Sequence, residues 1–463
     1  MQRTWIIEAA KKIGEEVRLQ GWVHRRRNMG KMVFIDLRDQ TGICQVVFLT
    51  NHVEALTVAG NLNHEDVVTI VGKVNARPAK QVKADQPCGS FEIEALELDI
   101  ISAATLPPFE VNKNTSEVGE DLRLKHRYLD LRSERMHRNI TLRSQYVQKA
   151  REYLYASGFI EIETPLLTKS TPEGSRDFLV PSRQHPGSFY ALPQSPQQYK
   201  QLLVGSGFER YFQLARCIRD EDLRADRGYE HTQLDLEMAF VEYNDVLDLV
   251  EGMVTSAVEA LGFTIKQKPF PRVTYQESMA KYGADKFDLR DAEDKANGVL
   301  AFAWVIEFPF FEKTDDGKWT FTHNPFSMPK PEHLEWLLQG KNIEQIITQQ
   351  YDLVCNGYEA GGGSIRAHQP EILRATYKVM GYTDAEIEAS IGHMLEAFKY
   401  GFPPHGGIGL GVERMLMNLT GEDYLREVQA FPMTTHGQTA VMSAPAPISE
   451  EQLKELHLNV IRD

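Results

Sequence analysis

The sequence predicts an α+β protein with two domains, a small N-terminal β-barrel and a larger domain built on an antiparallel sheet flanked by helices. Residues 15–102 contain about five short segments of alternating hydrophobic and polar residues, separated by turn-like breaks. Residues 211–241 contain two further alternating segments joined by a charged loop. Segments with helical spacing stand before and after this pair, at 134–156 and 244–261.

The chain has 463 residues, of which 42% are hydrophobic and 25% are charged. This length allows two or three domains, and this composition is typical of a soluble globular protein. No hydrophobic run approaches the ~18 residues of a membrane span, and residues 1–12 lack a signal-peptide pattern. We therefore expect a cytoplasmic protein without a membrane partner.

The cysteines indicate the redox compartment and the absence of structural zinc, and the net charge bears on whether nucleic acid is a partner. The four cysteines are Cys44, Cys88, Cys217 and Cys355. Their wide separation favours a reducing compartment and argues against a structural zinc site. The net charge of −14 disfavours a nucleic-acid partner at first sight. Phosphate contacts need only a local basic surface, however, and residues 24–27 (HRRR) offer one.

The first five alternating segments lie near 16–24, 32–38, 43–49, 66–75 and 90–101, and five strands fit an OB-fold. An exposed aromatic ring beside basic and amide groups is suited to stack on unpaired bases and to read them. Phe34, with the arginines before it and Gln45 after it, has this character. The residues alone also allow Phe34 to be part of the core and the arginines to be a solvated edge.

The following residues suggest the domain boundaries. We assign the barrel to residues 1–103 and a linker or hinge to 104–133. The first part of this second segment is polar, contains proline and shows no hydrophobic period. The large domain then runs over 134–463. It opens with a helix near 134–156 that Gly158 ends, and a later helix near 244–261 has Asn244 as its expected N-cap.

The charged loop lies between strands expected at 211–218 and 232–241, with Gly228 in the turn region. Odd-numbered positions of the second strand share one face, so Gln233, Asp235 and Glu237 would form a polar wall. An ordinary solvated loop is the alternative that composition leaves open.

Three segments in order resemble the signatures of the class II aminoacyl-tRNA synthetases. Residues 219–227 (RDEDLRADR) followed by 232–238 (TQLDLEM) resemble the second signature in the form found in bacterial aspartyl-tRNA synthetases. Residues 159–165 (FIEIETP) resemble the first, and 406–415 (GGIGLGVERM) the third. The resemblance implies an ATP-dependent ligase that joins L-aspartate to tRNA(Asp), a class II catalytic domain, and a homodimer formed through that domain.

The resemblance also assigns roles to single residues. Catalytic roles fall on Arg219, Glu221 and Arg414. The aspartate-binding set is Glu173, Ser195, Gln197, Lys200, Arg219, Gln233, Asp235, His323 and Arg366. The ATP-binding set is Arg219, Asp220, Glu221, Gly228, His231, Glu359, Gly411, Val412, Glu413 and Arg414. The set at the tRNA anticodon is Arg25, Arg27, Phe34, Gln45, Arg77 and Glu92.

Asp352 and Glu359 match the acids that hold the ATP-bound Mg²⁺ in the family, and oxygen ligands suit this ion. They are seven residues apart, so in one regular strand they would point to opposite faces. A β-bulge is therefore needed for both to reach one ion.

The sequence departs from the bacterial pattern in three places. Bacterial members usually carry a large insertion between the segments that match 282–290 and 303–309, and here it is reduced to a short connection near 288–300. Asn324 stands where the family usually has a second histidine after His323. His231 stands where the family usually has the phenylalanine that stacks on adenine.

Two other functions are kept as alternatives. An asparaginyl-tRNA synthetase is the nearer one, but a carboxamide substrate does not need the two cations Lys200 and Arg366. The other is a catalytically inactive, tRNA-binding relative. The sequence also leaves open whether tRNA(Asn) is accepted beside tRNA(Asp), for which Met29 next to the basic run is the position to inspect.

Overall fold

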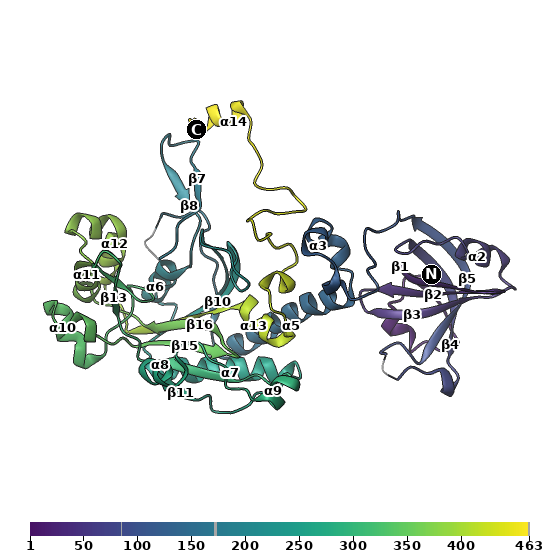
Figure 1. Ribbon diagram of the computed structural model, residues 1–463, viewed down its shortest axis with the longest axis horizontal. Coiled ribbons are helices and arrows are strands. Elements are labelled where there is room, and N and C mark those ends of the chain that lie inside the picture. The colour runs from purple at the N-terminus through teal and green to yellow at the C-terminus, as the bar shows by residue number, and fades with distance from the viewer. Residues whose placement is uncertain (85, 171–173, 462–463) are drawn as a thin grey trace. The chain divides into compact units, whose positions relative to one another are not determined.

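The computed structural model describes residues 1–84, 86–170 and 174–461 (Figure 1). These residues divide into two compact units, Met1–His137 and Arg138–Asp463, each with its own hydrophobic core.

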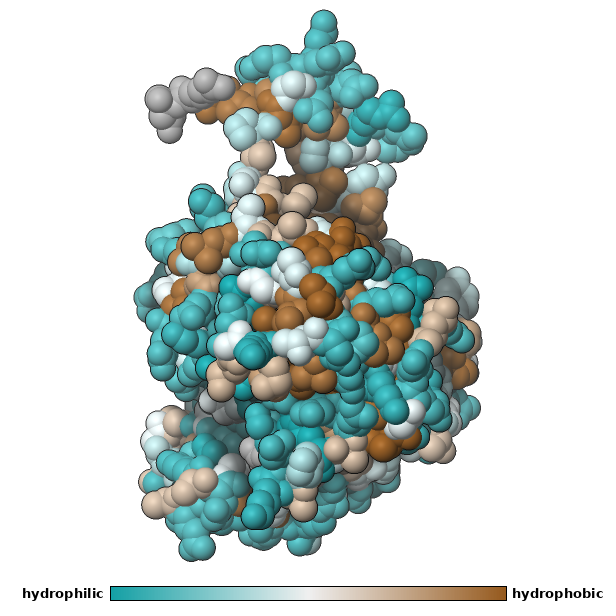
Figure 2. Space-filling model, turned by 90° about the vertical axis from the view of Figure 1, so that its right-hand side faces the viewer, coloured by the Kyte–Doolittle hydropathy of each residue, from teal (hydrophilic) through white to brown (hydrophobic). Residues whose placement is uncertain are grey.

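The first unit contains a closed barrel with the strand order β1-β2-β3-β5-β4. Its strands are β1 (Glu16–Met29), β2 (Met32–Asp39), β3 (Gly42–Phe48), β4 (Val67–Ala76) and β5 (Phe91–Ser102). Two short helices, α1 (Ile6–Ala9) and α2 (Val53–Ala59), pack on it. Every second residue of β2 is buried, which is the alternation that predicted these strands. The five-stranded barrel is therefore confirmed. The face of the molecule drawn in Figure 2 carries both hydrophilic and hydrophobic side chains.

Residues 104–133, predicted as a linker, contain η2 (Thr115–Glu117), α3 (Glu120–Lys125) and α4 (Arg127–Asp130) and group with the first unit. The carboxylate of Asp130 is fully buried and accepts hydrogen bonds from the Thr115 hydroxyl at 2.6 Å and from Arg123 at 3.3 Å. These contacts fold the segment locally. The helices have only six and four residues, too few to show a hydrophobic period in the sequence.

The second unit is built on an eight-stranded sheet with the order β11-β12-β15-β16-β17-β10-β9-β6. In this order the strands are Arg272–Thr274, Phe302–Ile306, Gln350–Cys355, Tyr358–Ile365, His405–Gly411, Glu230–Ala239, Arg210–Ile218 and Ile160–Glu161. The pairs β11·β12 and β6·β9 are parallel and the central pairs are antiparallel, so the sheet is mixed. The predicted hairpin is its β9·β10 pair.

One face of this sheet is covered by α5 (Glu134–Ala156), α7 (Tyr243–Ala260) and α13 (Val412–Thr420). The even-numbered residues of β10, such as Leu234 and Leu236, enter the core beneath these helices. The N-cap of α7 is Glu242, two residues before the predicted one, and its backbone N–H donates to Asp245 at 2.8 Å. The predicted N-cap Asn244 instead lies inside the helix.

Further elements surround the opposite face. Helices α6 (Gln197–Gly205), α11 (Pro370–Val379) and α12 (Asp384–Phe398) belong here, and α6 lies across the sheet from α7 (Figure 1). A capping box formed by Thr383 and Glu386 begins α12. The other elements are β7 (Leu179–Pro181), β8 (Phe189–Ala191), α8 (Tyr275–Tyr282), α9 (Ala292–Ala296), β13 (Phe311–Lys313), β14 (Trp319–Phe321), α10 (Leu334–Gln339) and α14 (Glu450–Glu455). Among the described residues, no helix is long and apolar enough to span a membrane.

Candidate active site

A cavity of about 290 Å³ lies on the sheet face that carries the polar side of β10. It brings together most of the residues that the sequence assigned to aspartate and ATP. They are Ser195, Gln197, Lys200, Arg219, Glu221, Gly228, His231, Gln233, Asp235, His323, Glu359, Arg366, Gly411, Glu413 and Arg414. Two members of the predicted polar wall, Gln233 and Asp235, are therefore part of the lining, whereas Glu237 is fully buried.

Three assigned residues that the structure describes are not in this lining. Asp220 lies beside Arg176, with 3.4 Å between its carboxylate and the guanidinium. Val412, the first residue of α13, is 1% exposed and packs in the core, because its side chain points away from the cavity. Asp352 is buried beneath the surface of the cavity. Glu173 lies outside the residues that the structure describes.

Glycines open the floor of the cavity between β10, β16 and β17. A Cβ atom on Gly409 would lie 2.1 Å from the side chain of Gln233, and one on Gly362 would lie 2.8 Å from the carboxylate of Asp352. Both distances are far below van der Waals contact. Glycine at these positions thus leaves room for polar side chains beside the strands.

Two cations and two acids form a buried cluster at the end of the cavity. The Lys200 ammonium lies 2.6 Å from Asp235 and 3.2 Å from Glu237. The Arg366 guanidinium donates to Glu237 at 2.9 Å. All four side chains are at most 3% exposed, so the cluster is nearly closed to water and electrically neutral.

The cluster leaves one acceptor unused. Burial raises the pKa of Asp235, although Lys200 opposes this shift. Its oxygen Oδ2 is buried and accepts no well-formed hydrogen bond from the described residues; the Tyr211 hydroxyl, which lies beside Asp235, donates to Gln213. An ammonium group entering the cavity would satisfy this oxygen. For Glu237, burial raises the pKa, but Arg366 and Lys200 outweigh burial and hold it at about 2.

Asp352 and Glu359 meet over Gly362. They lie on the neighbouring strands β15 and β16 of a hairpin, rather than on one strand, and the pairing of these strands shifts register at Leu353 and Val354. The pairing is irregular, as expected, but the hairpin rather than a bulge in a single strand brings the two acids together. A Cβ atom on Gly362 would lie 2.8 Å from Asp352 and 3.5 Å from Glu359, so both carboxylates reach the same small space.

The two carboxylates differ in charge state. Burial and the neighbouring Glu359 raise the pKa of Asp352 to about 7. Burial also acts on Glu359, but Arg414, Lys286 and His323 hold the pKa of this group at about 2. Asp352 Oδ2 is buried and accepts no hydrogen bond from the described part of the chain. This buried oxygen lies 4.0 Å from the His323 imidazole and beside a second carboxylate. A carboxylate oxygen that accepts no hydrogen bond in this setting fits a hard divalent cation.

Arginines line the other end of the cavity. Arg414 lies 3.1 Å from Asp226 and 3.6 Å from Glu359, and Arg227 lies 3.3 Å from Glu221. Burial, together with the positive charges of Arg219 and Arg414, lowers the pKa of His231 to about 3. The imidazole of His231 is thus neutral at physiological pH.

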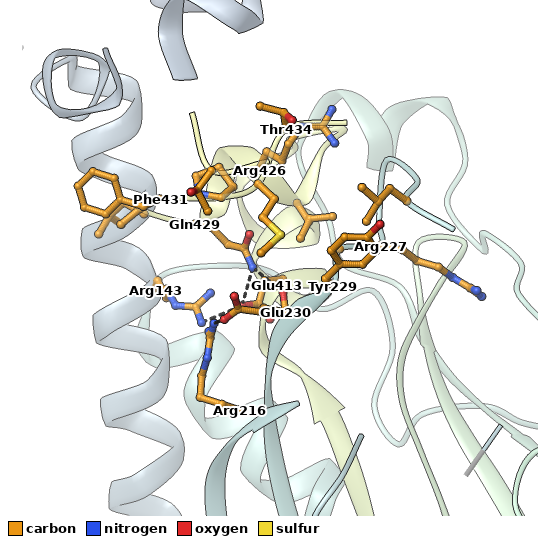
Figure 3. A pocket seen from close by; sticks show the side chains of 18 residues that line it. Arg143, Arg216, Arg227, Tyr229, Glu230, Glu413, Arg426, Gln429, Phe431 and Thr434 are labelled. Carbon is orange, nitrogen blue, oxygen red and sulfur yellow. Dashed lines mark hydrogen bonds and ion pairs between the residues drawn. The ribbon is translucent and has the colours of Figure 1, made fainter. Parts of the chain in front are cut away.

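A second cavity, of about 320 Å³, lies behind the hairpin (Figure 3). Glu413 reaches into it and accepts hydrogen bonds from the backbone of Thr232 at 3.0 Å and from Gln429 at 3.3 Å. Arg143 of α5 lies 2.9 Å from the same carboxylate. These contacts tie α13 to the hairpin and α5. The carboxylate of Glu413 is therefore engaged by the protein, although the sequence assigned this residue to ATP.

The outer face of the barrel carries a polar network. Arg27 donates to Asp36 at 2.8 Å and to Gln45 at 3.2 Å, and Gln45 donates to Glu92 at 2.9 Å. Arg77 lies 3.6 Å from Glu92, and Arg25 is exposed on β1. Phe34 is half-buried between the core residues Val33 and Ile35, so its ring belongs to the outer face.

Some site residues were missed from the sequence. Asp226 holds Arg414, and its position in the charged loop was a usable signal. Gln350 lines the cavity and donates to Asp352 at 3.3 Å, but nothing in its sequence context marks it. Asp36 joins the barrel network and shares the alternation of Phe34.

Comparisons with known proteins agree with this geometry. Residues 119–435 match the family of class II tRNA synthetases (D, K and N), and residues 17–101 match the OB-fold nucleic acid binding domain. Class II synthetases use ATP with a divalent metal. The solved asparaginyl-tRNA synthetase from Pyrococcus horikoshii, complexed with asparaginyl-adenylate, has a TM-score of 0.75 and 24% identity over 94% of this chain and 98% of its own. The aspartyl tRNA synthetase from Entamoeba histolytica has a TM-score of 0.74 and 23% identity over 93% and 91%. At 24% and 23% identity, these two likenesses establish the fold of this chain.

Relatives of higher sequence identity show to which branch of the class II synthetases this chain belongs. The aspartate–tRNA(Asp/Asn) ligase of Rubrobacter xylanophilus is 38% identical over 97% of this chain and 95% of its own length. The aspartate–tRNA ligase of Geobacillus kaustophilus is 37% identical over 97% of each. The first alignment extends over 577 positions, more than the 463 residues present, so this chain lacks a stretch that the relative has. The chain therefore belongs to the bacterial aspartyl-tRNA synthetases, which are ATP-dependent ligases of class II.

Proposed function

We propose that this chain joins L-aspartate to the 3′ end of tRNA(Asp) in two steps. The α-carboxylate of aspartate attacks the α-phosphate of ATP, which forms aspartyl-adenylate and releases pyrophosphate. A hydroxyl of the terminal adenosine of the tRNA then attacks the adenylate, which forms the ester and releases AMP. No protein nucleophile is required, so the chain acts by positioning groups and neutralising charge.

The buried cluster of Lys200, Arg366, Asp235 and Glu237 is the observation that carries this proposal. The α-ammonium of aspartate would donate to the unused oxygen Oδ2 of Asp235. The side-chain carboxylate would lie against Lys200 and Arg366. The guanidinium of Arg366 already donates to Glu237, Ser364 and Gly407, so it would contribute its positive charge and share these hydrogen bonds with the substrate. Gln233 and Ser195 offer further polar contacts in the lining.

Charge explains the choice of aspartate over asparagine. The empty cluster holds two cations and two anions and is neutral. The ammonium and side-chain carboxylate of aspartate add one charge of each sign, so neutrality is kept. Asparagine adds only the ammonium and leaves a net positive charge in a buried site, which costs several kcal/mol. This supports aspartate rather than the asparagine alternative.

The nucleotide would occupy the other end of the cavity. Arg219 is suited to hold the α-carboxylate and the α-phosphate together, and Arg414 the γ-phosphate end. A bound Mg²⁺ would neutralise phosphate charge, and Asp352 and Glu359 would hold it. The neutral ring of His231 would stack on adenine. Because all of these groups except the buried Asp352 line one cavity, the arrangement supports an active enzyme rather than an inactive relative.

The barrel is proposed to bind the anticodon loop. Phe34 would stack on an unpaired base, and the network of Arg27, Gln45 and Glu92 would read base edges. The four cysteines are all free and buried, which supports a cytoplasmic location. Exposed Ile160, Leu166 and Leu167, beside the first-signature proline Pro165, support a homodimer through the catalytic domain.

Acceptance of tRNA(Asn) is the second candidate, because relatives such as the Rubrobacter protein are named ligases for tRNA(Asp/Asn). Charging assays with purified tRNA(Asp) and tRNA(Asn) test both candidates. We expect aspartate to be attached to tRNA(Asp) at micromolar enzyme or less. Attachment to tRNA(Asn) as well would establish the broader specificity, and attachment to neither would refute the proposed function.

A further inference from the structure

The loop between α8 and α9 lies at the metal carboxylates, although no step above uses it. Its Lys286 ammonium lies 3.1 Å from Oε2 of Glu359. The carboxylate of the preceding Asp285 lies close to two other groups of the site, since ligand atoms of Asp285, His323 and Asp352 are all within 4.8 Å of one another. The adjacent residues Asp285 and Lys286 thus lie close to the carboxylates of β15 and β16, respectively.

Contacts on both sides of Asp285 and Lys286 hold this loop in place. Gly283 ends α8 in the left-handed conformation (φ 69°) and turns the chain. Phe287, 6% exposed, enters a core cluster and stacks on Tyr282 with 4.2 Å between ring centroids. Asp288 then accepts hydrogen bonds from the backbone and guanidinium of Arg290. Asp285 and Lys286 are thereby held between a helix end and a core side chain.

Three carboxylates therefore meet at this place: Asp285, Asp352 and Glu359. Such a group of like charges needs cations nearby. Arg414 supplies one, but it lies 3.6 Å from Glu359 and is also held by Asp226. Lys286 is the cation closest to Glu359 among the ion pairs of the described residues.

We propose that Lys286 is a built-in counter-cation of the metal site, which occupies Glu359 in the ATP-free protein and lowers its affinity for divalent cations. The inference rests on the proposed role of Asp352 and Glu359 in holding the metal. When ATP binds, the Lys286 ammonium moves from the Glu359 carboxylate to the negatively charged phosphates, and Glu359 becomes free to bind the metal. Tight metal binding is thereby tied to the presence of the nucleotide.

The side chain of Lys286 is suited to this exchange. It is 35% exposed, and Glu359 is 24% exposed, so the pair is partly screened by water. Partly exposed ion pairs are weak and readily exchanged. Lysine also carries a compact charge on a flexible stem, which can swing without moving the anchored loop.

The test measures Mn²⁺ binding to the full chain without ATP, by electron paramagnetic resonance of the free ion. Lys286→Met should bind Mn²⁺ about fivefold more tightly than the natural chain. Lys286→Arg, which keeps the charge, should resemble the natural chain. Lys341→Met is the matched control, because it removes the same charge from an exposed side chain whose ammonium bonds to Gln339 and, within the described part of the chain, to no other residue. Unchanged affinity in Lys286→Met would overturn the inference.

A second arm separates this inference from the proposed metal site. Mn²⁺ binding is repeated with a non-hydrolysable ATP analogue, on the natural chain and on Glu359→Gln. Weaker binding in Glu359→Gln together with the gain in Lys286→Met supports both ideas. Weaker binding in Glu359→Gln without that gain leaves the metal site standing and rejects the role of Lys286. Undiminished binding in Glu359→Gln rejects the metal site, and the inference falls with it.

Discussion

The ammonium of Lys200 lies 2.6 Å from Oδ1 of Asp235, and both side chains are almost fully buried. In the ligand-free protein, the cation expected to bind the substrate side chain is thus already paired with the acid expected to bind the substrate ammonium. Aspartate carries both complementary groups and would join this cluster without adding net charge. We therefore expect the pair to serve substrate recognition, and its loss to lower stability.

Replacement of Lys200 by Met should damage both properties. Removing one partner of a buried ion pair leaves Asp235 and Glu237 short of positive charge, and such changes destabilise proteins by about 3–5 kcal/mol. We expect a lower midpoint of thermal unfolding and a rise in the aspartate KM with a much smaller effect on the ATP KM. Lys341→Met, an exposed charge-matched change, should alter neither value. An unchanged aspartate KM would contradict the role given to Lys200.

Replacement of His231 by Phe tests the adenine contact. The imidazole is neutral because burial and nearby arginines lower its pKa to about 3, so it should stack as an uncharged ring at all pH values from 5 to 8. A larger aromatic face should stack more strongly, which lowers the ATP KM several-fold and leaves the aspartate KM unchanged. Identical ATP KM values for the two chains would remove His231 from the adenine site.

Replacement of Asp352 by Asn should separate stability from activity. The pKa of Asp352 rises to about 7 in the folded protein from an ordinary 3.8. Between these values the folded state holds a proton that the unfolded state has lost, so this group makes the protein less stable as pH rises through that window. Asp352→Asn should therefore unfold at a higher temperature than the natural chain at pH 8 and at nearly the same temperature at pH 4.

The same carboxyl group gives metal binding a pH dependence. Mg²⁺ needs the deprotonated form, so its affinity in the presence of ATP should fall below pH ~7, by up to tenfold per pH unit. Asp352→Asn should bind the ion poorly at every pH. Titration of Mg²⁺ dependence at pH 6 and pH 8 measures this, and equal affinities at the two values would contradict the assigned pKa.

Replacement of Phe34 or Gln45 by Ala should affect only the tRNA. Stacking on an unpaired base is worth about 1–3 kcal/mol, so kcat/KM for tRNA charging should fall accordingly. ATP–pyrophosphate exchange does not need tRNA and should stay unchanged. Val33→Ala, a change in the barrel core next to Phe34, controls for loss of fold, since it should lower stability more than either surface variant. A fall in exchange for Phe34→Ala would indicate a role other than anticodon binding.

The elements predicted well are those whose signal is local. The barrel strands and the β9·β10 hairpin follow the alternation of side chains, and α5 and α7 follow the helical spacing of their core residues. The polar wall of Gln233 and Asp235 follows from the same alternation, because facing positions on a strand are set by its period of two.

The features that could not be predicted depend on contacts distant in sequence. Glu413 is engaged by Arg143 and Thr232, which come from two other elements. Asp352 and Glu359 reach one point through a hairpin and a shift of register, which their spacing alone did not define. Residues 104–133 fold through the buried carboxylate of Asp130, and no hydrophobic period announces that contact.

The central claim is that this cavity activates aspartate and excludes asparagine. Pyrophosphate exchange into ATP, measured with each amino acid on the natural chain and on Lys200→Met, tests it most directly. We expect fast exchange with aspartate, almost none with asparagine, and a large loss of the aspartate-dependent exchange in Lys200→Met. Exchange with asparagine at a similar rate, or no exchange with either amino acid, would contradict it.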